Sequence, residues 1–398
     1  MRTKNPLHQG RIDCIEILRA FAVLFVVVHH IKGSLLTITT PNLVRFYDYF
    51  SGWVGVDLFF AISGFVIARS LLPQLNEKRN RQAFWRTALS FWIRRAWRLL
   101  PSSWLWLLII LVCAVFYNDS GVFGSFRTNF AATLAALFNV ANVRFADAFG
   151  SYTYGASFVY WSLSLEEQFY LFLPFVLFLF RRWFPYLFAL AVVFQLFSQR
   201  SLLLMAFRTD AILLGVLLAL WSQTESYRLF EPKGLKKSPF AALVVLGILL
   251  VGLVCMPSKS LQIIPLPVGM VALISILLVW LASYNGPYIL PVSPLRKIFC
   301  WVGSRSYAIY LIHIPVFYAV RETLHRTGSE PAESPVVVLF ALAAIFFLSD
   351  LNYRFLEQPL RKKGAKIADR IKRGAGVSVA GVTAPAEDPK TNTVESVR

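Results

Sequence analysis

The stretch RAFAVLFVVVHH, residues Arg19 to His30, places a cation and two histidines at opposite ends of nine consecutive apolar residues. It lies in an apolar segment near residues 14–36, and about 20 such residues are enough to cross a bilayer. The whole chain shares the apolar character of this segment, because 57% of its 398 residues are hydrophobic and only 15% are charged. Soluble domains carry about a quarter charged residues. We therefore predict an all-α polytopic membrane protein.

Further apolar segments of this kind set the expected topology. Together with the first, the segments are 14–36, 53–72, 99–117, 128–141, 165–181, 184–198, 203–221, 239–256, 263–283, 305–321 and 335–356. The fourth is short and flanked by Asn, so we interpret it as a re-entrant or partial helix. About ten transmembrane helices remain.

The distribution of basic residues predicts the orientation. Both the N-terminus and the region after residue 360 are basic, which places both termini in the cytoplasm and requires an even number of crossings. With ten crossings, 28 of the 40 Lys and Arg residues lie on the cytoplasmic side and 8 lie outside. We expect residues 1–363 to form one integral membrane domain. Residues 364–398 are rich in Gly, Ala, Thr, Pro and charge, and we expect a disordered cytoplasmic tail.

Charge and cysteine content exclude other classes. The net charge of +19 follows from the cytoplasmic loops of this topology, so we expect membrane lipids and no nucleic acid as partners. The four cysteines are scattered, without a CxxC pair or a His cluster at metal spacing. We therefore predict no metal site and no structural disulfide. We also expect no bound cofactor.

The opening stretch has two candidate site residues on one helix face. Arg19 and His30 are eleven residues apart, about 20° from a whole number of helical turns and about 16 Å along the axis. His29 points about 80° away from that line. Glu16 can pair with Arg19 at i,i+3. Because ionisable groups in a span usually face a cavity or a partner, Arg19 and His30 are candidates for function.

Other ionisable groups stand in or beside apolar runs. Asp57 lies in GVDLFFAISGFVI, where Gly55 and Gly64 allow another backbone to approach closely. A helix-start role for Asp57 near the outer interface is the alternative. Arg95 and Arg98, in FWIRRAWRLLP, share a helix face at the cytoplasmic mouth and can bind phosphates. Contact with anionic lipids is the alternative for these arginines.

A pair of glutamates follows the fourth segment. In WSLSLEEQFYLFLP, Glu166 and Glu167 point about 100° apart, so at most one faces a given cavity. Ser164 before them can cap the helix, and a glutamate in the first turn can do the same. Asp210 in FRTDAILLG and His313 in SYAIYLIHIP complete the set of possible accessory residues.

Together these stretches resemble the membrane acyltransferase family 3, in the same order and over roughly residues 11–363. NYRFLEQPLRK, residues 352–362, is similar to another of its recurrent stretches. The resemblance implies transfer of an acyl group, most often acetyl, from cytoplasmic acyl-CoA to a hydroxyl of a glycan or lipid-linked saccharide. This chain ends too soon for a fused SGNH-type domain, so it resembles the stand-alone type.

The resemblance also implies roles for individual residues. His30 would be the essential histidine and Arg19 its partner in the Arg/His signature. Arg95 and Arg98 would contact CoA. Glu167, or else Glu166, would be the glutamate of the Ser-Leu-x-x-Glu stretch. Asp57 or Glu167 would then orient His30 or bind the acceptor.

These residues leave two classes of function open. The expected function is an acetyl-CoA-dependent O-acyltransferase of the bacterial inner membrane, acting on a lipopolysaccharide, exopolysaccharide or other envelope or secreted glycan. The alternative is a proton-coupled transporter or glycan flippase, because buried ionisable groups also suit transport. No inverted repeat supports that alternative.

Overall fold

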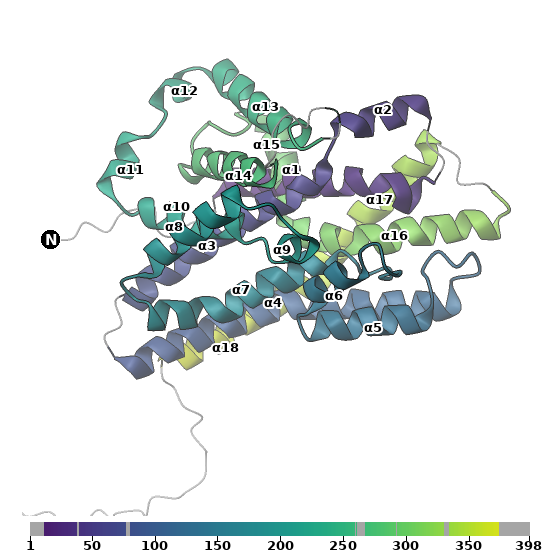
Figure 1. The fold of residues 1–398 in the computed structure, drawn as a ribbon, viewed down its shortest axis with the longest axis horizontal. Helices are drawn as coiled ribbons and strands as arrows, with labels where there is room; N and C mark the ends of the chain where they lie inside the picture. Colours follow the sequence, from purple (N-terminus) through teal and green to yellow (C-terminus); the bar gives the residue numbers. More distant parts are fainter. Residues whose placement is uncertain are drawn as a thin grey trace, which may run out of the picture.

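The structure is a computed structural model that describes residues 12–37, 40–76, 80–258, 260, 267–291, 293–329 and 334–373. Within these ranges every element is a helix, apart from one isolated bridge between Lys32 and Leu36, so the predicted all-α class is confirmed (Figure 1). The α-helices are α1 (Asp13–His30), α2 (Pro41–Tyr49), α3 (Gly55–Asn76), α4 (Arg81–Phe116), α5 (Phe126–Leu137), α6 (Ala141–Ala148), α7 (Tyr160–Leu179), α8 (Phe184–Phe197), α9 (Leu202–Ala206), α10 (Asp210–Trp221), α11 (Glu225–Leu229), α12 (Lys233–Lys237), α13 (Pro239–Cys255), α14 (Pro267–Ser283), α15 (Ser293–Ser304), α16 (Ser306–Arg326), α17 (Pro335–Asn352) and α18 (Gln358–Arg373).

The helices agree with a multi-pass membrane protein. In the described ranges, five helical stretches are long and apolar enough to cross a membrane, and four shorter apolar helices accompany them. The fourth predicted segment corresponds to α5, whose 12 residues extend about 18 Å, less than the roughly 30 Å of hydrocarbon. The count of ten crossings and the cytoplasmic termini stay predictions.

Glycines set the closest packing between α3 and α10. A Cβ atom on Gly64 would lie 2.0 Å from the carbonyl oxygen of Ile212, and one on Gly215 would lie 2.3 Å from that of Ala61. On the same helix, a Cβ on Gly55 would meet the carbonyl oxygen of Ala22 in α1 at 2.2 Å. The predicted close approach at Gly55 and Gly64 is therefore confirmed, and α3 packs backbone to backbone against both α1 and α10.

This packing predicts opposite outcomes for one substitution at two glycines. Gly64→Ala forces two backbones apart, so we expect it to destabilise the protein by about 3 kcal/mol. Gly247→Ala, in α13 with nothing within 4 Å of the new Cβ, is expected to be neutral or slightly stabilising. Thermal unfolding in detergent micelles measures both. Equal melting temperatures for the two variants would contradict the close packing of α3 against α10 at Gly64.

The predicted disordered tail is partly wrong, because α18 continues to Arg373. Figure 1 shows α18 lying along α4. Gly364 packs directly against Trp97, Ala368 is buried, and Asp369 pairs with Arg94. Composition suggested disorder, but the apolar and small residues of this stretch recur at helical spacing and meet α4. Residues 374–398 of the predicted tail lie outside the described residues.

Candidate active site

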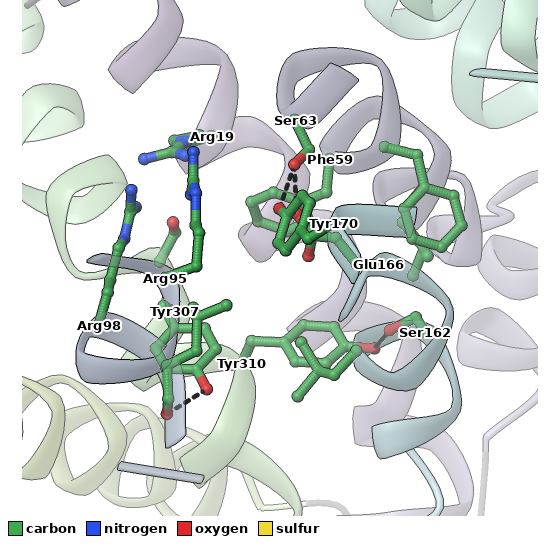
Figure 2. Close-up of a pocket in the computed structure, with 15 residues that line it drawn as sticks. Arg19, Phe59, Ser63, Arg95, Arg98, Ser162, Glu166, Tyr170, Tyr307 and Tyr310 are labelled. Carbon is green, nitrogen blue, oxygen red and sulfur yellow. Dashed lines mark hydrogen bonds between the residues drawn. The ribbon is translucent and has the colours of Figure 1, made fainter. Parts of the chain in front are cut away.

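A narrow inner cavity lies among α1, α3, α4, α7 and α16, and its volume is about 60 Å³. The polar side chains that line it are Arg19, Ser63, Arg95, Arg98, Ser162, Glu166, Tyr170, Ser306, Tyr307 and Tyr310. Figure 2 shows the three arginines on one side of the cavity and Glu166, Ser63 and Tyr170 across from them. Four residues singled out in the sequence, Arg19, Arg95, Arg98 and Glu166, therefore meet at one site.

Glu166 is held by two hydroxyl groups. Ser63 Oγ and Tyr170 OH both donate to its Oε1, and the two hydroxyls also contact one another. The sequence prediction placed Ser63 within a recognised stretch but gave it no role, and it missed Tyr170. Tyr170 is four residues after Glu166 on one helix, so helical spacing alone places it on the same face.

The arginines give the inner cavity a positive character. The guanidinium of Arg95 lies 5.0 Å from the ring centroid of Tyr170, and Arg19 Nη1 lies 3.7 Å from Glu16 Oε1. The predicted i,i+3 pair of Glu16 and Arg19 is thus confirmed. Three guanidiniums face one carboxylate across the cavity, so an anionic or strongly polarised ligand suits it.

His30 is joined to His313, an accessory candidate from a distant part of the chain. Nδ1 of His30 lies 3.0 Å from the carbonyl oxygen of Val26 and 3.2 Å from Nε2 of His313. Nδ1 of His313 lies 2.7 Å from the carbonyl oxygen of Tyr310. His313 is fully buried, and the ring of Phe158 packs edge-on against His30.

These distances fix the tautomers of the two neutral rings. A carbonyl oxygen only accepts, so Nδ1 of His313 carries a proton and its Nε2 is a bare acceptor. His30 must then donate from Nδ1, which leaves Nε2 of His30 as a free lone pair. A free imidazole nitrogen held in one orientation is the arrangement that a general base or a nucleophile needs.

The cavity and the histidine pair are neighbours on α16. Tyr310 lines the inner cavity and lies one turn before His313, with 5.7 Å between their ring centroids. Tyr310 OH also contacts Ser162 Oγ at 2.7 Å. The tyrosine therefore separates the arginine-lined space from the histidines.

Asp57 does not orient His30 as the sequence suggested, because it forms an ion pair with Arg208 at 3.0 Å. Asp57 is fully buried, and the guanidinium of Arg208 lies 5.0 Å from the ring centroids of both Trp53 and Trp161. The role of Asp57 visible in the structure is to neutralise a buried arginine.

Asp210 likewise neutralises a buried arginine, because it forms an ion pair with Arg200 at 2.5 Å. Glu167 is adjacent to Glu166 but does not line the inner cavity. Ser164 Oγ accepts from the backbone N–H of Ala141 at 3.3 Å, so it ties α7 to the start of α6. Of the two glutamates, the geometry favours Glu166 over the preferred Glu167.

The part of the chain that the structure describes contains no set of side chains suited to binding a metal ion. No group of three or more His, Cys, Asp or Glu residues there is close enough to hold an ion. The site instead offers guanidiniums for an anion, an anchored carboxylate and an oriented imidazole. This set of groups suits transfer of a group from an anionic donor.

The fold and the site together define a polytopic membrane protein with a buried ionisable centre. The family model described as "Acyltransferase domain" matches residues 12–354. The chain therefore belongs to the membrane acyltransferase family 3, as its sequence motifs indicated.

Curated relatives of the chain are named as O-acetyltransferases. It is 26% identical over 92% of its length to "Peptidoglycan O-acetyltransferase OatA" of Listeria monocytogenes. It is 28% identical over 89% of its length to "Putative O-acetyltransferase SACOL0978" of Staphylococcus aureus, and 25% identical over 88% to that organism's "O-acetyltransferase OatA". The chain spans 57–58% of the length of these relatives. No solved structure matches the chain significantly.

Proposed function

We propose that this protein transfers an acetyl group from cytoplasmic acetyl-CoA to a hydroxyl of a cell-envelope glycan, across the bacterial inner membrane. The carrying observation is the arginine-lined cavity that ends at Tyr310, one helical turn from the His30–His313 pair. The printed names of the relatives support O-acetyl transfer, and in one case peptidoglycan as the acceptor.

The reaction can run with His30 as a general base. Nε2 of His30 takes the proton of the acceptor hydroxyl, whose oxygen attacks the thioester carbonyl carbon. The new C–O bond forms as the C–S bond breaks, and the CoA thiolate then receives the proton from His30. The products are an acetyl ester and CoA thiol, with His30 restored.

A second route uses His30 as the nucleophile. Nε2 attacks the thioester, releases the CoA thiolate and carries the acetyl group to the acceptor hydroxyl. Overall, one proton passes from the acceptor hydroxyl to the CoA thiolate, so both routes give the same products from the same reactants. In both, we expect Arg19, about 16 Å along the helix axis from His30, to bind the anionic end of the donor.

His313 is a positioning residue in either route. Its Nε2 and the carbonyl oxygen of Val26 both accept from Nδ1 of His30, and together they hold the ring with Nε2 unprotonated. Glu166, with Ser63 and Tyr170, forms a polar wall that can hold the amide groups of the donor arm.

Transfer of radiolabel tests the proposal. Membranes that contain the protein, incubated with acetyl-labelled acetyl-CoA, are expected to accumulate alkali-labile label on envelope glycan, with one free thiol released per ester formed. Membranes without the protein provide the background. If neither ester nor thiol appears but solute or glycan movement depends on the protein, the transporter or flippase function replaces this one.

A further inference from the structure

A second, wider cavity opens at the ends of the helices that we predict to be cytoplasmic. Its volume is about 350 Å³, compared with about 60 Å³ for the inner cavity. Six charged residues line it, and they are Glu16, Arg19, Arg69, Arg98, Glu357 and Arg361. We call it the outer cavity because it lies nearer the helix ends than the inner cavity does. The name does not refer to the outer side of the membrane. Arg69 and Arg361 have no role in the site described above.

The outer cavity holds more guanidiniums than carboxylates. Four arginines face two glutamates, and Arg361 and Arg98 repel one another electrostatically. Nε of Arg98 is buried and has no hydrogen-bond partner among the described residues. A buried donor without a partner is destabilising, so an anion that accepts from it would be favoured.

The outer cavity adjoins the inner one, because two arginines line both. Arg19 and Arg98 line both cavities, whereas Arg361 lines only the outer and Arg95 only the inner. A ligand with a bulky polyanionic end and a thin arm therefore fits the two volumes in one direction only. The anionic end matches the wide arginine-rich space, and the arm matches the narrow one.

We propose that the outer cavity binds the phosphorylated nucleotide end of the donor, with Arg361 and Arg69 as phosphate ligands beside Arg98. The identity of the donor as acyl-CoA rests on the proposed function. This inference moves the nucleotide phosphates away from Arg95, which then contacts the pantetheine arm. Guanidinium groups suit this role because they donate two parallel hydrogen bonds to phosphate.

Equilibrium binding to the full chain in detergent separates the two ends of the ligand. The probes are CoA and its nucleotide fragment, adenosine 3′,5′-bisphosphate, titrated calorimetrically. We expect Arg361→Gln to weaken both probes by roughly 10-fold, the loss of one charge-assisted contact. Arg95→Gln is expected to weaken CoA and leave the fragment within twofold. Lys362→Gln, exposed on the same helix and outside both cavities, is the matched control and should change neither.

Each outcome of these titrations either supports the proposed phosphate site or overturns it. Unchanged affinity of both probes in Arg361→Gln would overturn the proposal, as would a fragment that Arg95→Gln weakens as much as Arg361→Gln does. Inorganic phosphate or phosphatidylglycerol that displaces the fragment equally well at the same concentration would show a general anion or lipid site instead. Failure of the proposed function is distinguishable, because nucleotide binding that depends on Arg361 without acetyl transfer would leave this site standing. A wild-type chain that binds no CoA would overturn both.

Discussion

His30→Ala is expected to lower the turnover number for acetyl transfer by at least about 100-fold, because the imidazole nitrogen that the Val26 and His313 contacts orient is lost. The KM for acetyl-CoA should change little, since the arginines that we propose as ligands of the donor stay in place. Initial rates of thiol release and ester formation in detergent-solubilised membranes measure both quantities. An equal melting temperature confirms that the variant is folded.

The neighbouring histidine provides the matched control for this prediction. His29 lies immediately before His30 on α1, with its ring centroid 5.2 Å from that of His30, whereas the hydrogen bond to His313 comes from His30. His29→Ala should therefore retain turnover within about threefold, well below the loss expected for an acid–base group. If His29→Ala is inactive and His30→Ala is active, the assignment from helical phase and from the His313 contact is wrong.

His313→Phe should lower turnover by about 10- to 100-fold, equivalent to about 1.4–2.7 kcal/mol for one buried hydrogen bond. Phe keeps the aromatic volume in the buried site but cannot accept from Nδ1 of His30. His30 then keeps the carbonyl acceptor of Val26 but loses the side-chain contact that helps to fix the orientation of its ring. The KM for acetyl-CoA is expected to stay within twofold, because His313 does not line the arginine-rich cavities in which we propose that the donor binds.

A rescue distinguishes this positioning role from a purely structural one. In His313→Gln the side-chain amide reaches the position of Nε2 and its oxygen can accept from His30. We expect His313→Gln to recover at least a third of the loss on a logarithmic scale, whereas a structural defect would be worse with the polar substitution. Equal turnover in His313→Phe and the wild type would show that His30 does not need its partner.

The helices and part of the site follow from short-range patterns in the sequence. Uninterrupted apolar runs predicted the long helices, and the i,i+3 spacing of Arg95 and Arg98 placed both on one helix face, which lines the inner cavity. Local spacing also predicted the Glu16–Arg19 pair. These features depend on residues within three or four positions of one another, so no tertiary information was needed.

Contacts between distant segments could not be predicted from the same patterns. Asp57 pairs with Arg208 and His30 with His313 across 151 and 283 positions of the chain, and periodicity carries no information on such partners. Choosing Glu166 over Glu167 required the rotation of α7 about its axis, which neighbouring helices set. The helical end of the chain was missed because its packing against α4, at Gly364, is also a long-range contact.

Sealed inside-out membrane vesicles provide the most direct test that transfer of an acyl group from a donor on one side to an acceptor on the other depends on His30. Labelled acetyl-CoA is added outside, on the cytoplasmic face, and glycan acceptor is enclosed in the lumen. We predict esterified label in the lumen and free CoA outside for the wild type and His29→Ala, and neither for His30→Ala. Esterification of the enclosed glycan at the wild-type rate by His30→Ala would contradict the account.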